Sequence, residues 1–157
     1  MGLDIYIDVA NREARDEVIA KNQEIYKRND KAFEEQGDEA EFEQPIDIPC
    51  TQEYYFRKFN ALVGWIENNV GALENCEPYF LLIELSKDDI EGLQATLNDL
   101  TPENCDIELP TCTGFFFGSQ EYDDWYWENV EKAKQMCNDI LEKTDWEKDV
   151  VTILIWY

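Results

Sequence analysis

Apolar and polar residues alternate at the start of the chain. The apolar positions are Leu3, Ile5, Ile7 and Val9. A period of two predicts a half-buried β-strand over residues 3–9. Residues 150–156, at the other end of the chain, are rich in β-branched side chains and predict a second strand. We expect these two strands to pair and so to close the domain.

Four longer segments show the three-to-four-residue period of an amphipathic helix. The first is capped by Asn11 and ends near Gln36-Gly37, and the others span residues 54–70, 86–100 and 119–143. Short apolar runs predict further strands at residues 79–85 and 114–118. The predicted fold class is α+β, with about four helices packed on a small sheet that contains the N- and C-terminal strands.

The chain has 157 residues, which predicts a single domain spanning 1–157. Pro45 and Pro49 interrupt any helix between residues 37 and 52, so this stretch is predicted to be a loop. No Lys or Arg occurs from Ala32 to Phe56. The acidic residues in and beside this loop are Glu34, Glu35, Asp38, Glu39, Glu41, Glu43 and Asp47.

Acidic residues dominate the composition. There are 36 Asp and Glu against 13 Lys and Arg, a formal charge of −23. Such a charge argues against nucleic acid or anionic lipid as a partner and favours basic proteins or cations. The chain has no histidine, which removes Ser-His and Cys-His nucleophile pairs and histidine-containing zinc sites.

The predicted helix from Ser119 has two contrasting sides. Its apolar positions are Tyr122, Tyr126, Val130, Ala133, Cys137 and Ile140. Its acidic positions are Glu121, Asp124, Glu128 and Glu131. At about 100° per residue the first set forms a packing face and the second a carboxylate stripe on the opposite side.

This stripe has two interpretations. A charge run on a helix is commonly a solvated face. However, no Lys or Arg accompanies the twelve acidic residues from Asp88 to Glu131, whereas exposed helices commonly interleave Lys to form stabilising pairs. The more specific hypothesis is that the stripe takes the place of nucleic-acid phosphates in a basic groove of another protein. Trp125 and Trp127 flank the packing face and resemble the aromatic anchors of protein interfaces, although Trp127 is better interpreted as packed under the 114–118 strand.

Metal and thiol chemistry are weaker alternatives. Asp123-Asp124 with Glu121 could hold Mg²⁺ or Ca²⁺ through oxygen ligands, but acidic pairs are common at helix starts. Cys105 and Cys112 lack histidine or a Cys-x-x-Cys pattern and are interpreted as small hydrophobic residues. No cofactor is predicted.

The five cysteines are an odd number, and the N-terminus is interpreted as a strand rather than a targeting segment. No apolar run approaches the roughly 20 residues of a membrane span. These features predict a cytoplasmic protein with reduced thiols.

Three stretches carry a resemblance to a known family: Met1-Gly-Leu-Asp-Ile-Tyr6, Arg57-Lys58-Phe-Asn60 with Trp65, and Leu109-Pro110 followed by Gly-Phe-Phe-Phe-Gly-Ser and Tyr122-Asp-Asp-Trp-Tyr126. In these the chain resembles small acidic proteins of bacteriophages and prophage-carrying bacteria. In that family a His precedes the second-helix Trp, where this chain has Val63. The resemblance implies that the chain is encoded by a phage or a prophage and is located in the cytoplasm of the host cell. It implies no specific activity.

These observations together predict a stoichiometric binding protein. The predicted partner is a basic, nucleic-acid-binding protein of the host, such as a CRISPR effector or another defence nuclease, with the chain acting as a DNA or RNA mimic. The predicted contact residues are Glu121, Asp124, Trp125, Glu128 and Glu131, together with Glu34, Glu35, Asp38, Glu39, Glu41 and Glu43. The alternatives are a carboxylate-based metal-dependent enzyme or metal-binding protein, and a phage housekeeping protein whose charge serves solubility.

Overall fold

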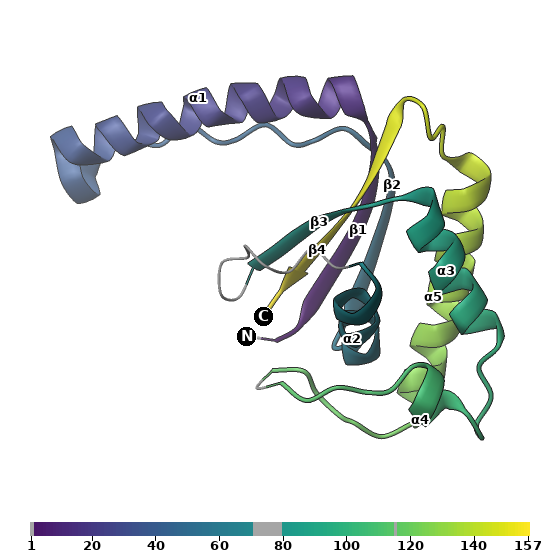
Figure 1. The fold of residues 1–157 in the computed structure, drawn as a ribbon. Helices are drawn as coiled ribbons and strands as arrows, with labels where there is room; N and C mark the ends of the chain where they lie inside the picture. The colour runs from purple at the N-terminus through teal and green to yellow at the C-terminus, as the bar shows by residue number, and fades with distance from the viewer. Residues whose placement is uncertain (1, 71–79, 115) are drawn as a thin grey trace.

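The computed structural model describes residues 2–70, 80–114 and 116–157. Within these residues the chain forms an α+β fold, with a four-stranded antiparallel sheet and five α-helices (Figure 1). The strands are β1 (Asp4–Asn11), β2 (Cys50–Arg57), β3 (Phe80–Leu85) and β4 (Asp149–Trp156). The helices are α1 (Arg12–Gln36), α2 (Asn60–Asn69), α3 (Lys87–Asn98), α4 (Cys105–Glu108) and α5 (Asp124–Lys143), with a short 3-10 helix at Gly37–Glu39.

The N- and C-terminal strands lie side by side at the centre of the sheet. The strand order is β2-β1-β4-β3, and every neighbouring pair is antiparallel. β1 pairs with β4 from Asp4↔Trp156 to Asn11↔Asp149, which confirms the predicted closing pair. Because side chains alternate along a strand, Ile5 and its apolar neighbours are fully buried on one face of β1, while Asp8 lies on the other.

Helices α2, α3 and α5 cover the buried face of the sheet (Figure 1). Ser86 begins α3 with the expected capping interaction: its hydroxyl accepts a hydrogen bond from the backbone N–H of Asp89, whose carboxylate accepts one from the N–H of Ser86. Ile90, Leu93 and Leu97 then enter the core. The helix predicted at 86–100 is confirmed as α3.

Helix α1 projects away from the body of the protein (Figure 1). Asn11 caps it as predicted, its side chain accepting a hydrogen bond from the N–H of Ala14. The helix ends at Gly37, which has a φ of 62° that glycine tolerates. Ile25 is its one buried residue, so most of α1 contributes little to the main core.

The loop predicted at 37–52 is shorter than expected, because β2 begins at Cys50, and hydrogen bonds hold it to α1. After the 3-10 turn, residues 40–49, here called the return segment, run back beside α1 (Figure 1). Asn29 exchanges two hydrogen bonds with the backbone of Glu43, at 2.9 and 2.8 Å. Asn22 exchanges two with the backbone of Ile46, at 2.8 and 2.7 Å. These side chains satisfy backbone groups that a free loop would leave to water.

The predicted helix at 54–70 is wrong in its first part. Residues 50–57 form β2 instead, and the helix begins at Asn60. The spacing of Tyr55 and Phe59 resembles a helical repeat, but pairing with β1 satisfies the backbone of residues 50–57. Lys58, at a φ of 55°, makes the turn between the strand and the helix.

The predicted strand at 114–118 is also wrong. Residues 114 and 116–118 are not in a strand, and residue 115 lies outside the described residues. The N–H of Phe117 bonds to the carbonyl of Gly114 at 3.1 Å, and Gly118 has a φ of 83°, so the chain turns here. β1 already has a neighbour on each side, which leaves no central place for another strand. Accordingly α5 starts at Asp124 rather than Ser119.

Candidate partner-binding surface

The packing face predicted for α5 is confirmed. Tyr126, Val130 and the four apolar residues Ala133, Met136, Cys137 and Ile140 of this helix are buried against the core, whereas Tyr122 precedes the helix and is partly buried. Asp123 caps the helix by accepting a hydrogen bond from the N–H of Tyr126 at 3.1 Å. The hydroxyl of Tyr126 donates to the carbonyl of Leu109 at 2.9 Å. These contacts fix the orientation of the opposite, exposed side of α5.

The carboxylate stripe lies on that exposed side, with one correction. Asp124, Glu128 and Glu131 are exposed and belong to α5. Glu121 is exposed as well, but it lies in the loop before the helix, so it is not part of the helical row. Glu131 is paired with Lys134 at 3.0 Å. The ordered stripe is therefore shorter than the sequence indicated.

Further acidic residues lie on the two helices that precede α5. Between Asp88 and Glu131 the sequence has twelve acidic residues and no basic one, and they lie on α3, α4, the first half of α5 and the joining loops. We call this set the acidic face; its members at the end of α3, on α4 and at the start of α5 lie together in Figure 1, whereas Asp88, Asp89 and Glu91 lie at the start of α3, at the other end of that helix. The acidic face consists of Asp88, Asp89, Glu91, Asp99, Glu103, Asp106, Glu108, Glu121, Asp123, Asp124, Glu128 and Glu131.

Most of the acidic face has no basic partner. Eleven of its members are exposed and Asp89 is half-buried. The flanking Lys87 and Lys134 pair with Glu91 and Glu131. The carboxylates of Asp89 and Asp123 cap helices. Within the described residues, the other members make no ion pair. The negative charges of these carboxylates are therefore available to a basic partner.

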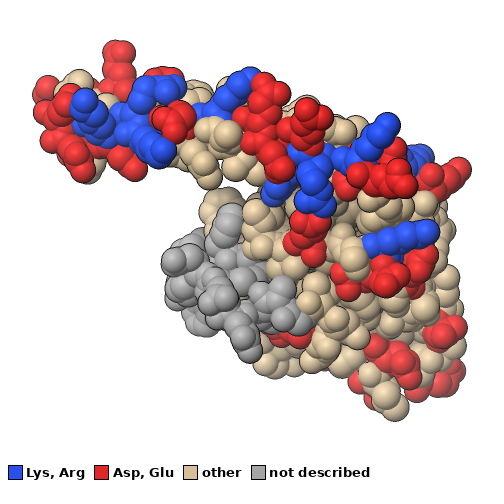
Figure 2. Space-filling model, turned by 45° about the horizontal axis from the view of Figure 1, so that its top comes forward, with Lys and Arg blue, Asp and Glu red and all other residues tan. Residues whose placement is uncertain are grey.

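The acidic face is held by packed helices. α3 and α5 share the core through Leu93, Leu97 and the buried side of α5, and Gln94 donates to the side-chain oxygen of Asn138 between them at 2.7 Å. In Figure 1 the end of α3, α4 and the start of α5 lie together at one end of the molecule. In Figure 2 basic side chains gather along α1, whereas acidic ones predominate over the body.

The second predicted contact region lies elsewhere. Glu34 and Glu35 end α1, Asp38 and Glu39 lie in the 3-10 turn, and Glu41 follows in the return segment. This end of α1 is remote from α5 (Figure 1). The structure therefore separates the two sets of predicted contact residues into two surfaces.

Glu43, the last acidic residue of that second set, is already engaged. Its carboxylate accepts hydrogen bonds from Nε and an Nη of Arg28 at 2.7 and 2.8 Å. These bonds lower the pKa of Glu43 from its ordinary value. Glu43 thus holds the return segment to α1 and is a weaker candidate for partner contact than its neighbours.

The two tryptophans of α5 differ in environment. Trp125 is 51% exposed, beside the carboxylates at the start of α5. Trp127 is partly buried against the core, with its ring edge-on to Tyr126 at a centroid distance of 5.2 Å. Trp125 is therefore the aromatic side chain available to a partner.

Asn60 organises the loop that leads into α5. Its side chain is buried and donates to the carbonyls of Phe117 and Ser119 at 3.1 and 2.9 Å. Its side-chain oxygen accepts a hydrogen bond from the N–H of Cys112 at 3.1 Å. A narrow cleft beside it is lined by Lys58, Thr111, Ser119, Glu121, Asp123 and Trp125, among others. The resemblance stretches around residues 57–60 and 109–126 therefore meet here, a contact that sequence spacing alone does not predict.

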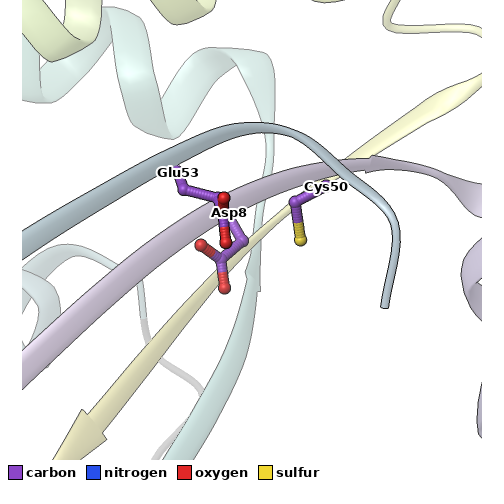
Figure 3. A group of neighbouring side chains, drawn as sticks. All are labelled: Asp8, Cys50 and Glu53. Atoms are coloured by element: carbon purple, nitrogen blue, oxygen red, sulfur yellow. The ribbon is translucent and has the colours of Figure 1, made fainter. Parts of the chain in front are cut away.

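A group of potential metal ligands lies on the other face of the sheet. Asp8 of β1 is directly opposite Glu53 of β2, and Cys50 is near both (Figure 3). The thiol and one carboxylate oxygen of each acid lie within 4.8 Å of one another. Sequence reasoning missed this group because it placed Tyr54 and its neighbours in a helix.

Burial and neighbouring negative charge disfavour the charged forms of Asp8 and Cys50. Burial and then the charge of Glu53 raise the pKa of Asp8. Burial and then the charges of Asp8 and Glu53 raise the pKa of Cys50 to about 11. A cation would relieve this repulsion. By contrast, Asp123 of the predicted Asp123-Asp124 site is engaged as a helix cap.

The cysteines predicted to act as small hydrophobic residues have packing or hydrogen-bonding roles. Cys105 is buried, and Cys112 is half-buried with its thiol donating to the carbonyl of Asn60 at 2.8 Å. Both are free thiols.

Comparison with models of protein families, with curated proteins and with solved structures gives no match to this chain. Among the helices of the described residues, none combines the length and the apolar character needed to cross a membrane.

Proposed function

We propose that this chain is a stoichiometric binding protein whose acidic face occupies a basic, nucleic-acid-binding surface of another protein. The observation that carries this proposal is the set of exposed carboxylates between Asp88 and Glu131, which includes no Lys or Arg. Side chains one turn apart on a helix are about 5–6 Å from each other, so α5 presents a fixed row of negative charge. Nucleic-acid-binding grooves are built to receive such a row.

The rigid support of the acidic face favours a specific partner over a purely solvating role. A charge that only maintains solubility needs no particular geometry. Here α3 and α5 are packed through the core, and Asn60 fixes the loop before α5. Trp125 adds an exposed aromatic side chain beside Asp123 and Asp124. Aromatic anchors near charged rims are common in protein interfaces.

The resemblance to phage and prophage proteins suggests the partner class. We propose a defence nuclease or CRISPR effector of a bacterial host, inhibited because its nucleic-acid site is occupied. Attraction between opposite charges would make association fast and would weaken it as salt increases.

The test is capture of partners from bacterial lysate on the immobilised chain, with elution by increasing salt. Two variants carry four charge reversals to Lys each. The first changes Glu121, Asp124, Glu128 and Glu131, and the second changes Glu34, Glu35, Asp38 and Glu39. Each variant moves the net charge from −23 by +8 to −15, so only the position of the charge differs.

We expect the wild-type chain and the second variant to retain the same basic protein, and the first variant to lose it. Added double-stranded DNA should release the retained protein because both compete for one site. Equal loss in both variants would show that capture depends on net charge alone. Unchanged capture by the first variant would exclude the acidic face.

The Asp8, Cys50 and Glu53 group favours a second candidate, a metal-binding protein. One thiolate and two carboxylates would leave one position of a tetrahedral zinc site open for water or substrate. Because sulfur prefers softer ions, Zn²⁺ should raise the melting temperature at low micromolar concentration, whereas Mg²⁺ and Ca²⁺ should not.

The matched control for this second candidate is Cys50→Ser. The stabilisation by Zn²⁺ should disappear in this variant and should increase with pH in the wild type, because binding displaces the thiol proton. An equal stabilisation of the variant, or none in the wild type, would eliminate the metal site.

A further inference from the structure

A hollow of about 730 Å³ lies between α1, the return segment and the outer face of the sheet, which is the face turned away from α2, α3 and α5. Asp8 and Glu53 line it from the sheet and Tyr26 lines it from α1. The return segment contributes residues 45–48, which include Asp47. No Lys or Arg is among the described residues that line the hollow. Its lining therefore combines negative charge with aromatic and apolar side chains.

Two of the carboxylates face each other on neighbouring strands. Asp8 of β1 is directly opposite Glu53 of β2, and Figure 3 shows their side chains together. Like charges directly opposite each other destabilise a sheet. Asp8 is also half-buried, and burial together with the charge of Glu53 raises its pKa. A positive group placed between the two carboxylates would remove this repulsion.

The described part of the chain supplies no such group. Among its residues, the side chains of Asp8, Asp47 and Glu53 take part in no ion pair and no hydrogen bond. Arg15 is near enough to Cys50 to oppose the rise in the pKa of that thiol, but its guanidinium pairs with Asp16 at 3.6 Å. The three carboxylates of the hollow are therefore available to a cation from outside the chain.

The rest of the lining indicates that this cation is organic. Tyr26 is 51% exposed and Ile46 is 45% exposed, and both line the hollow. An aromatic ring attracts a cation over its face, and apolar side chains bury methylene groups. A hydrated inorganic ion gains neither contact. The hollow thus matches the chemistry of an alkylammonium ion.

The carboxylates come from two walls of the hollow. Asp8 and Glu53 belong to the sheet, whereas Asp47 belongs to the return segment. This second wall is held by Asn22, which exchanges hydrogen bonds of 2.8 and 2.7 Å with the backbone of Ile46. A ligand with an ammonium group at each end of a methylene chain can contact both walls at once, which a single ammonium group cannot.

We propose that this hollow binds a linear diamine or polyamine, with one ammonium group between Asp8 and Glu53, another at Asp47, and the methylene chain along Ile46. Each ammonium group would donate hydrogen bonds to carboxylate oxygens. This inference does not depend on the proposed function, because the hollow and the acidic face share no residue. It shares Asp8 and Glu53 with the metal-binding candidate, so its test uses the chain after treatment with a chelator.

The test is isothermal titration calorimetry of the purified, metal-free chain with putrescine, butylamine and Mg²⁺, each at about 0.15 M salt. Near neutral pH putrescine carries two positive charges, as Mg²⁺ does, because alkyl amines ionise near the pKa of Lys, about 10.4. We expect a single putrescine site whose affinity exceeds that for butylamine or Mg²⁺ by about tenfold or more. Putrescine binding only above about 1 mM, or equal affinity for putrescine and either other probe, would overturn the proposal.

Paired substitutions locate the site. Asp8→Asn with Glu53→Gln should weaken putrescine binding by about tenfold or more, because one ammonium group loses both charged partners. Glu67→Gln with Glu142→Gln is the matched control: it removes the same two negative charges from exposed positions on α2 and α5 that form no ion pair among the described residues. Its affinity for putrescine should equal that of the wild type. Equal weakening in both paired variants would show attraction to the net charge of −23 alone, and unchanged binding in the first would exclude the hollow.

Discussion

Replacing Asn60 tests how the loop before α5 is held. The side chain of Asn60 makes three hydrogen bonds to backbone groups, two as donor to the carbonyls of Phe117 and Ser119 and one as acceptor from the N–H of Cys112. The residue is only 2% exposed, so water cannot replace these bonds without local opening. Asn60→Ala would therefore leave three backbone groups without partners.

The expected loss of stability is large for a single polar residue. A buried polar group left without a partner costs about 1–3 kcal/mol. Since the Ser119 carbonyl is partly accessible to water, we expect a total of about 3–5 kcal/mol rather than the upper sum. For a chain of this length, 1 kcal/mol corresponds to about 2–4 °C, so Tm should fall by roughly 10 °C.

Asn22→Ala is the matched control. Asn22 also makes two hydrogen bonds to backbone groups, at Ile46, but these are exposed. Water can replace them, so the free energy of unfolding should fall by less than about 1 kcal/mol. Urea denaturation gives the free energy for each variant, and an unchanged m-value shows that the two are comparable.

Asn60→Asp adds a test of the donor role. An aspartate keeps an acceptor for Cys112 but places oxygen against two carbonyls, so its loss of stability at neutral pH should at least equal that of the alanine variant. Protonation would restore one donor, so the deficit should shrink in acid. The reasoning would be refuted if Asn60→Ala and Asn22→Ala lost equal stability, or if Asn60→Asp matched the wild type at neutral pH.

Three further predictions concern the outer face of the sheet and the return segment. The raised pKa of Asp8 means that the charged carboxylate is disfavoured in the folded state, so this carboxylate destabilises the fold only as the pH rises through the raised pKa. Asp8→Asn should therefore stabilise the protein at neutral pH, by less than about 1 kcal/mol in urea denaturation. Below the pKa of Asp8 in the unfolded chain, the substitution should not stabilise the protein. The same substitution should lower the pKa of Cys50 from about 11 and speed its alkylation at pH 8, as followed by peptide mass spectrometry, and an unchanged rate would show that the charge of Asp8 does not contribute to this pKa. Replacing Asn22 and Asn29 together by Ala should speed proteolysis of the return segment while Tm changes little, and a cleavage rate equal to that of the wild type would show that other contacts hold the segment.

Local signals in the sequence correctly predicted much of the fold. The alternation in residues 3–9, the cap at Asn11 and the capping box at Ser86 each specify an element without reference to the rest of the chain. The pairing of β1 with β4 follows because both are strongly apolar on one face. These elements could be predicted because their backbone groups form hydrogen bonds with residues nearby in the sequence or, for β1, with the other strongly apolar strand, β4.

The two errors occur where distant parts of the chain decide the structure. Residues 54–57 have helix-like spacing, and only the long-range pairing with β1 makes them a strand. Residues 114–118 are largely apolar in sequence, yet the carbonyl of Phe116 accepts a hydrogen bond from the N–H of Leu3 and the carbonyl of Phe117 accepts one from the side chain of Asn60. Neither partner can be identified from local periodicity.

The candidate surfaces were likewise predicted where local periodicity determines them and missed where contacts between distant parts of the chain do. The periodicity of Asp124, Glu128 and Glu131 placed them correctly on the exposed side of one helix. The sequence did not show that the end of α3 and α4 lie beside the start of α5, because that depends on helix packing. The neighbourhood of Asp8 and Cys50 depends on strand register, which a helical interpretation of β2 could not supply.

Carboxyl footprinting of the chain, free and bound to its captured partner, tests the central proposal most directly. Exposed carboxylates are coupled to an amine in both states, and mass spectrometry reports which ones the partner covers. The proposal predicts protection at Asp106, Asp124 and Glu128, with Glu39 and Glu41 labelled equally in both states. Protection confined to Glu39 and Glu41, or no protected carboxylate on the acidic face, would contradict it.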